Sequence, residues 1–270
     1  MDNTKPIALI TGASSGIGLE LAKQFGQNGH DLIVVAEDAA GLESAAVMLR
    51  EGGARVDPIV ADLSRMDGAA RVYEEVQRLG LDVDVLVNNA GVGVYGKFIE
   101  TSLDEEVAMI HLNTMAYVQL TKFFAPRMVQ RGSGKILMTA SVASKMPTPY
   151  MSVYGATKAF VYEFAQGLRE ELHDSGVTVT ALLPGPTDTN FFERAHATDS
   201  KIMDEHLTDP AAVAQAGFEA TMKGQDKVIV PLKYKVQATM NQLVPDAVVA
   251  KQARKKHEPK DDAQREEEHP

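Results

Sequence analysis

The chain is 270 residues long, acidic and free of cysteine, with 37 Asp and Glu against 27 Lys and Arg and a formal net charge of −10 at pH 7. This charge disfavours nucleic acids and anionic membranes as partners, because their phosphate groups would be repelled. The lack of cysteine excludes disulfides, thiolate metal sites and a cysteine nucleophile. No apolar run reaches the roughly 18 residues of a membrane span, and the first residues show no basic leader. We therefore expect a cytoplasmic protein without a metal site.

Short apolar runs alternate with segments of helical periodicity. Hydrophobic residues make up 44% of the chain, enough for one large core, so we expect a single domain over residues 1–250. The expected strands are 7–10, 32–36, 56–61, 83–87, 135–139, 177–183 and 228–230, and the expected helices are 19–26, 42–49, 69–79, 103–128 and 160–172. Most strand runs are continuously apolar, which is typical of strands covered on both faces. The pattern predicts an α/β fold of Rossmann type, with a doubly wound parallel sheet and helices on both faces.

Two later segments depart from this alternation. Residues 187–209 are polar, with two phenylalanines and helix fragments, which predicts a flexible lid over the ligand site. Residues 251–270 hold six basic and six acidic side chains and few apolar ones. We expect this charged tail to be largely disordered, with helix only up to about His257, because it has little apolar surface to bury.

Three glycines follow the first expected strand, in the sequence Thr-Gly-Ala-Ser-Ser-Gly-Ile-Gly at residues 11–18. Gly12 allows a sharp turn, Gly16 lets a ligand approach the backbone, and Gly18 lets the next helix pack close to the strand. The N–H groups at the start of that helix favour the pyrophosphate of a nucleotide. Many surface turns carry glycines, so the motif needs its context. The residues expected to contact the cofactor here are Gly12, Ser14, Ser15, Gly16, Ile17 and Gly18.

Acidic residues follow the second and third expected strands. Glu37 lies at the distance from the glycines where a carboxylate accepts hydrogen bonds from the adenosine ribose, although a solvated strand end explains it as well. A carboxylate there repels the 2′-phosphate of NADP, and neither Asp38 nor the nearby serines supply the cation that this phosphate needs. We therefore favour NAD, with NADP not excluded. Asp62, followed by Leu63, is placed to touch the adenine.

Two asparagines and two small residues follow the fourth expected strand, at residues 88–91. Small side chains allow a cofactor to approach, and amide side chains can brace the neighbouring loop. An ordinary Asn-rich turn is the alternative, but the glycine motif upstream favours a functional one. We expect Asn89, Ala90 and Gly91 to contact the cofactor.

Tyr154 and Lys158 are four residues apart, so on a helix both project from one face, although this spacing also occurs by chance. A tyrosine pKa of about 10 makes it a poor proton-transfer group near neutral pH, and a nearby ammonium favours the phenolate. Lys158 would supply that charge and hold the ribose hydroxyls of a nicotinamide nucleotide. Ser141, after a strand, can hydrogen-bond a substrate oxygen beside Tyr154. Asn113 can hold a water that connects Lys158 to solvent.

In combination and order, these motifs resemble the short-chain dehydrogenase/reductase family over roughly residues 5–190. The resemblance implies a catalytic tetrad of Asn113, Ser141, Tyr154 and Lys158. Its further motif is Pro184-Gly185 with Thr189, which implies a nicotinamide near Pro184, Gly185 and Pro186, with Thr187 and Thr189 reaching its carboxamide or the phosphates. Glu37 departs from the arginine that many family members carry for NADP. The resemblance also implies a homodimer or homotetramer formed through helices around 103–128 and 154–173.

These residues predict an oxidoreductase that transfers hydride reversibly between a nicotinamide cofactor and an alcohol or ketone, with Tyr154 as acid/base. The side chains that would form an apolar substrate pocket, unless they are ordinary core residues, are Tyr95, Met146, Met151, Phe191 and Phe192. Lys145 is a candidate partner for an acidic substrate group. The alternatives are an NADP-dependent carbonyl or 3-oxoacyl reductase and a non-catalytic dinucleotide-sensing protein.

Overall fold

Seven parallel strands form the centre of the fold in the computed structural model, which describes residues 5–204, 206–234 and 244–260. The strands are β1 (Ile7–Thr11), β2 (Asp31–Ala36), β3 (Val56–Val60), β4 (Val85–Asn88), β5 (Gly134–Thr139), β6 (Val177–Pro184) and β7 (Lys227–Val230). They lie in the order β3-β2-β1-β4-β5-β6-β7. The expected strands and the doubly wound sheet are confirmed.

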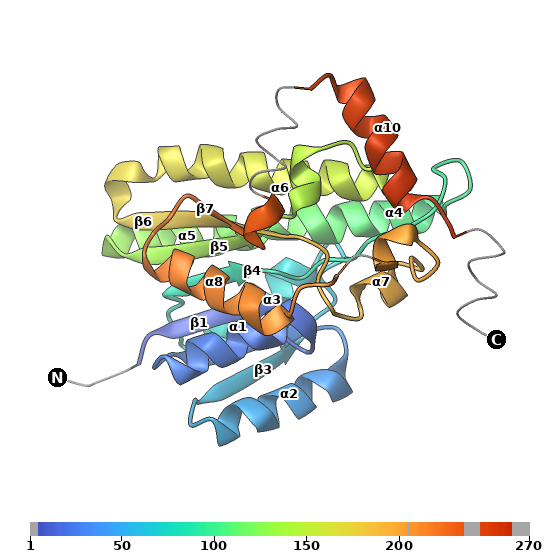
Figure 1. The fold of residues 1–270 in the computed structure, drawn as a ribbon. Coiled ribbons are helices and arrows are strands. Elements are labelled where there is room, and N and C mark those ends of the chain that lie inside the picture. The colour runs from blue at the N-terminus through green and yellow to red at the C-terminus, as the bar shows by residue number, and fades with distance from the viewer. Residues whose placement is uncertain (1–4, 205, 235–243, 261–270) are drawn as a thin grey trace.

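Helices cover both faces of this sheet (Figure 1). One face carries α1 (Gly16–Gln27), α2 (Ala39–Glu51) and α8 (Pro210–Met222), and the other carries α3 (Gly68–Arg78), α5 (Ala116–Arg131) and α6 (Ser152–Glu171). Consecutive side chains of β1 enter opposite cores: Leu9 joins the α3–α5–α6 side, whereas Ile10 packs on the α1–α2–α8 side. Burial on both faces explains why these strands are continuously apolar.

The expected helix over 103–128 is not continuous. It is divided into α4 (Leu103–Ile110), a π-helical turn η1 (His111–Met115) and α5. In η1 the N–H of Ala116 bonds to the carbonyl oxygen of His111, five residues earlier. Such π-turns are frequent at functional sites because they alter the direction of side chains within a helix, and Asn113 lies at the centre of this one.

The C-terminal part of the described chain forms a helix that ends where the sequence predicts it to end. Helix α10 spans Asp246–His257, and its Val249, Ala253 and His257 are buried. These side chains recur every fourth residue, so together they form a stripe on one helix face. Helix α10 ends at His257, in agreement with the expected end of helix, while the expected disorder of the tail stays a prediction and residues 261–270 lie outside the described residues.

The expected lid segment, 187–209, contains the short helix α7 (Phe191–Arg194) and the 3-10 turn η4 (Lys201–Asp204). Its flexibility stays a prediction. Within the ranges that the structure describes, no helix is long and apolar enough to cross a membrane.

Candidate active site

A cavity of about 270 Å³ lies where the strands end at their carboxyl side, next to the point where strand order reverses between β1 and β4. Ligands of doubly wound sheets bind at this place. Of the predicted site residues, those that line the cavity are Gly12, Ser14, Ser15, Gly16, Ile17, Gly18, Glu37, Asp62, Leu63, Asn89, Ala90, Gly91, Ser141, Tyr154, Lys158, Pro184, Gly185, Thr187 and Thr189. Asn113 is not among the described residues that line it.

The glycine motif forms the turn between β1 and α1. Gly12 and Gly16 have φ values of +68° and +56°, in the left-handed region that glycine adopts without strain. A Cβ on Gly18 would overlap the carbonyl oxygen of Gly12, so only glycine lets the helix pack this closely. Ser15, at the N-cap, makes no side-chain hydrogen bond to the first N–H groups of α1 within the described structure. Those donors are therefore available to bind an anion.

Asn89 braces the loops at the ends of three strands, as predicted for an amide at this position. Its Nδ2 donates to the Thr11 carbonyl at 3.0 Å, and its Oδ1 accepts from the Thr139 hydroxyl at 3.2 Å. The Thr11 hydroxyl in turn accepts from the backbone N–H groups of Asn89 and Ala90. The edge of the cavity is therefore fixed by side chains that are themselves fully bonded.

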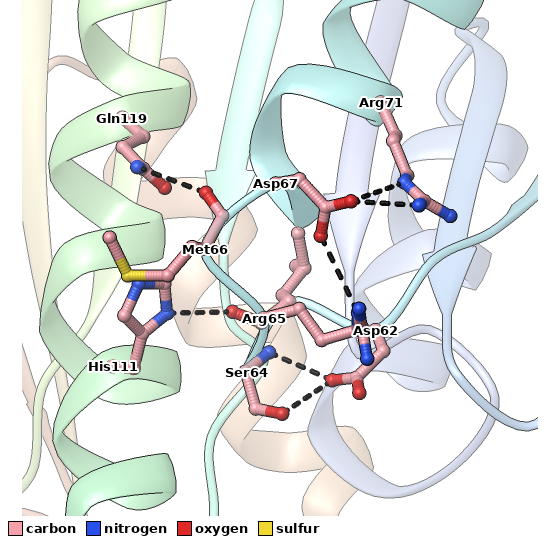
Figure 2. A network of polar contacts seen from close by, with 9 residues as sticks. Asp62, Ser64, Arg65, Met66, Asp67, Arg71, His111 and Gln119 are labelled. Atoms are coloured by element: carbon pink, nitrogen blue, oxygen red, sulfur yellow. Dashed lines mark hydrogen bonds and ion pairs between the residues drawn. The ribbon is translucent and has the colours of Figure 1, made fainter.

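The loop after β3, where adenine binding is predicted, is held by the π-turn and α5 (Figure 2). Asp62 Oδ1 accepts from the backbone N–H and the hydroxyl of Ser64, at 2.9 and 2.6 Å. A ring nitrogen of His111 lies 3.4 Å from the carbonyl oxygen of Leu63 and donates to it in the matching tautomer. Gln119 Nε2 lies 3.5 Å from the carbonyl oxygen of Met66, in the same loop. The segment formed by η1 and α5 thus carries Asn113 and also supports the loop where adenine binding is predicted.

Carboxylates dominate that end of the cavity. Glu37 and Asp38 follow β2 on its rim, and Asp38 caps α2 by accepting from the N–H of Gly41. The Lys and Arg side chains of the described cavity lining are Lys158, Arg194 and Lys256. None of the three comes from the loops after β2 and β3.

Tyr154, Lys158 and Ser141 meet at the opposite end of the cavity. Lys158 Nζ donates to the carbonyl oxygen of Thr139 at 2.9 Å and lies 5.9 Å from the ring centroid of Tyr154. Ser141 accepts from the N–H of Ala143 at 3.1 Å, and its hydrogen bond with Tyr154 lowers the pKa of that phenol. The predicted triad of hydroxyl, phenol and ammonium is thus assembled on one wall.

Burial shifts the pKa values of Tyr154 and Lys158 so that the neutral form of each is favoured. It raises the pKa of Tyr154 to about 12, an effect larger than the hydrogen bond from Ser141. It also lowers the pKa of Lys158 to about 7. Burial, which favours the neutral form of both groups, therefore dominates these pKa shifts, and the lowering of the Tyr154 pKa by Lys158 stays a prediction.

Asn113 is fully buried and its amide is occupied. Its Oδ1 accepts from the N–H of Val92 at 3.0 Å, while its Nδ2 donates to the Val92 carbonyl at 2.9 Å and to the Thr157 hydroxyl at 3.1 Å. A Cβ on Gly91 would lie 3.1 Å from Asn113 Oδ1 and 3.2 Å from Lys158 Nζ. Asn113 thus ties α6 to the loop after β4, with Gly91 as the spacer.

The expected substrate pocket is partly corrected. Four of the expected residues line the cavity, namely Met146, Met151, Phe191 and Phe192. Tyr95 does not line it, and its hydroxyl instead donates to the carbonyl oxygen of His257. Lys145 Nζ lies 3.1 Å from the ring centroid of Tyr162 and is not a lining residue.

Several lining residues carried no recognisable signal in the sequence. They come from the lid and the C-terminal part and are Arg194, Ile202, Tyr234, Lys256 and His257. Each is remote in sequence from the motifs, and only folding brings it to the cavity. Thr157, which donates to the Tyr154 carbonyl and accepts from Asn113, had one usable signal: it lies between Tyr154 and Lys158 on the same helix.

The arrangement of glycine turn, tyrosine and lysine has clear relatives. The family profile described as short chain dehydrogenase matches residues 6–200. The chain belongs to the short-chain dehydrogenase family. It is 29% identical over 230 residues to the ketoacyl reductase HetN of Nostoc sp., covering 84% of this chain and 79% of that protein.

Solved structures of this family share the fold. A short-chain dehydrogenase from Sphingobium yanoikuyae in complex with NADPH has a TM-score of 0.79 and 37% identity, over 88% of this chain and 94% of that one. The bulky-bulky ketone specific alcohol dehydrogenase from Comamonas testosteroni has a TM-score of 0.74 and 33% identity, over 90% of this chain and 96% of that one. The protein is therefore an NAD(P)-dependent short-chain oxidoreductase that acts on an alcohol or ketone.

The cavity of this short-chain dehydrogenase fits a nicotinamide dinucleotide. A Cβ on Gly12 would come within 2.9 Å of the Ala90 backbone, and a Cβ on Gly16 within 3.1 Å of the Thr189 side chain, so side chains here would crowd the groove. The helix N–H groups suit a pyrophosphate. The described residues contain no group of three or more His, Asp or Glu placed to hold a metal ion.

Replacing Lys158 by Met should stabilise the ligand-free protein most at low pH. The folded protein lowers the pKa of Lys158 to about 7 from a reference value of 10.5, so between these values the unfolded chain binds the extra proton. The free-energy cost of burying the ammonium is thus greatest below about pH 7 and disappears above about pH 10.5.

Thermal unfolding between about pH 6 and about pH 10 measures this effect. The Tm gain of Lys158→Met over the native protein should shrink as the pH rises. Lys122→Met, at an exposed position of α5, is the control, and its Tm difference from the native protein should not shrink in this way as the pH rises. A Tm gain for Lys158→Met that is constant with pH would contradict the lowered pKa.

Proposed function

We propose that this short-chain dehydrogenase transfers hydride reversibly between NAD and an apolar alcohol or its ketone, with Tyr154 as acid/base. The observation that carries the proposal is the meeting of Tyr154, Ser141 and Lys158 on one wall of the cavity into which the glycine turn opens. Met146, Met151, Phe191 and Phe192 supply an apolar wall for the substrate. We also propose that residues 187–209 act as its lid.

In this mechanism Ser141 and Tyr154 hydrogen-bond the substrate oxygen. For reduction of a ketone, Tyr154 donates its proton to that oxygen, and the raised pKa keeps the phenol protonated at neutral pH. For oxidation, Tyr154 must first lose its proton to form the phenolate, which protonated Lys158 favours, and the phenolate then accepts the hydroxyl proton. Bound NAD supplies the carbon that accepts or gives the hydride.

Asn113 acts in this proposal as a positioning residue. Because its side-chain amide is already bonded to Val92 and Thr157, a relay water would use its main chain rather than its side chain. The π-turn supports this role because it replaces the regular helical bonding at this position. Lys158 would pass the proton to that water.

Tyr154→Phe should lower kcat by at least about a hundredfold, because general acid–base catalysis contributes on this order, while the dissociation constant of NADH changes little. Steady-state assays with a panel of ketones and alcohols, together with NADH fluorescence titration, measure both. Tyr162→Phe is a matched control on the same helix, since Tyr162 is not a lining residue, and it should keep its activity.

Two outcomes would contradict this assignment. Retained turnover in purified Tyr154→Phe would remove the proposed acid/base. NADH binding by the native protein without turnover across the whole panel would favour a dinucleotide sensor instead.

The adenosine end supports NAD as the cofactor. Glu37 and Asp38 both border the cavity, and the basic lining residues come from other parts of the wall. Two carboxylates near the ribose would repel a 2′-phosphate, whereas a free 2′-hydroxyl can donate to one of them. The Sphingobium relative is in complex with NADPH, so the choice needs a direct test.

NADH should bind at least about tenfold more tightly than NADPH, a difference of about 1.4 kcal/mol in binding free energy. Glu37→Gln should reduce this gap in affinity, because it removes one of the two carboxylates that repel the 2′-phosphate. Fluorescence titration of both nucleotides measures it. Glu43→Gln, on the exposed side of α2, is the control and should keep the gap. Asp38 is unsuitable for the test because its side chain also caps α2. Tighter binding of NADPH by the native protein would favour an NADP-dependent carbonyl or 3-oxoacyl reductase.

A homodimer or homotetramer is proposed for the assembly, formed over α4 and α6. Leu103 and Val107 on α4 are 76% and 55% exposed, and Phe160 on α6 is 44% exposed. These two helices contact each other, so their apolar side chains suit a shared interface.

Val107→Glu should shift the protein toward the monomer, because it would bury a charge at that interface. Light scattering coupled to size-exclusion chromatography measures the mass. Met48→Glu introduces the same charge at a comparably exposed apolar position of α2 and should leave the mass unchanged. A native protein that is already monomeric would contradict the proposal.

A further inference from the structure

The end of helix α10 is fastened to the lid. The carbonyl oxygen of His257 accepts from the Tyr95 hydroxyl at 2.6 Å and from the Ser200 hydroxyl at 3.3 Å. Lys260, only 8% exposed, pairs with Asp204 of η4 at 2.8 Å. Figure 1 shows α10 beside the part of the fold that carries α7 and α4. The C-terminal segment is thus part of the wall around the cavity.

This docking brings basic side chains to the substrate end of the cavity. Lys256 of α10 and Arg194 of α7 both line it and are exposed on its rim. The acidic lining residues are Glu37, Asp38 and Asp62, all from the loops after β2 and β3. The cavity therefore has an acidic adenosine end and a basic rim at the substrate end, in a chain whose net charge is −10.

The third basic lining residue, Lys158, differs from Arg194 and Lys256 because it is buried. Lys158 donates to the Thr139 carbonyl beside Tyr154, deep in the cavity. Arg194 and Lys256 instead belong to the two segments that close the cavity above the catalytic wall. These segments also contribute apolar side chains to the lining of the cavity, among them Phe192 and Ile202. A ligand that reached from Tyr154 to Arg194 and Lys256 would therefore need an apolar body.

We propose that Arg194 and Lys256 form a specificity site for an anionic group, a carboxylate or a phosphate, at the far end of an apolar substrate. The inference rests on the proposed function, since it names the substrate class of the same site. The guanidinium of an arginine matches both oxyanions with two parallel hydrogen bonds, and lysine adds a compact positive charge. Two cations at an entrance also raise the local concentration of an anionic substrate.

The binding test uses ligands that share one alkyl chain and differ at the end: decanoate, decyl phosphate and methyl decanoate. Each is titrated into the protein–NADH complex by calorimetry. The two anions should bind at least about tenfold more tightly than the ester, as expected for hydrogen bonds to charged groups. Whichever anion binds better identifies the carboxylate or the phosphate.

Arg194→Gln and Lys256→Gln should each weaken binding of the preferred anion by roughly tenfold and leave the ester unaffected. Lys255→Gln is the matched control, because it removes the neighbouring charge of the same helix without altering the cavity lining. With oxo acids as substrates, both variants should raise KM and leave kcat nearly unchanged, while the methyl esters show no change.

Three results would overturn the inference. The first is equal binding of the anions and the ester by the native protein, and the second is an equal loss of affinity for both ligand types in the variants. The third is weakened NADH binding in the variants with no loss of affinity for the anions. The last result would assign these cations to the cofactor. Tyr154→Phe separates the two proposals, since it should lose turnover and still prefer the anion. If it kept turnover and this preference, only the proposed acid/base would fail.

Discussion

The Thr11 hydroxyl joins the two strands between which the sheet reverses its order. It donates to the Val87 carbonyl of β4 at 3.3 Å and accepts from the N–H groups of Asn89 and Ala90 at 2.9 and 3.0 Å. A hydroxyl has one donor and two acceptor positions, so all are used. Because β1 and β4 are held at their carboxyl ends, the groove beyond them keeps its shape. The glycine turn and the catalytic wall lie on either side of that groove.

Water exclusion shapes the catalytic wall and also opposes its ionisation. Burial raises the pKa of Tyr154 to about 12 and lowers the pKa of Lys158 to about 7, so the ligand-free wall favours neutral side chains. The Thr139 carbonyl holds the lysine without supplying a negative charge. A bound cofactor changes the charges around both groups, which makes ligand binding and protonation interdependent.

Residues 187–209 and helix α10 contribute further side chains to the lining of the cavity, among them Arg194 and Lys256. They are joined through the His257 carbonyl and through Lys260, so a change in one is transmitted to the other. Their basic residues lie at the end of the cavity opposite to Glu37. The cavity thus carries two separate groups of charges, to which our proposals assign the choice of cofactor and the choice of substrate.

The alternation of apolar runs was enough to predict all seven strands and the doubly wound sheet, because strands buried on both faces must be apolar throughout. Local motifs were also enough to identify many of the residues that line the cavity, since Gly12 to Gly18 lie within one turn and helix start and Tyr154 and Lys158 lie on one helix. Tertiary structure alone divided the helix at Asn113, because its amide bonds to Val92 and Thr157, which are remote in sequence. It alone set the direction of the pKa shifts, which depend on burial. It alone brought Lys256 to the cavity, because the Ser200 hydroxyl donates to the His257 carbonyl and the Lys260 N–H donates to the Asp199 carbonyl, contacts that no local pattern records.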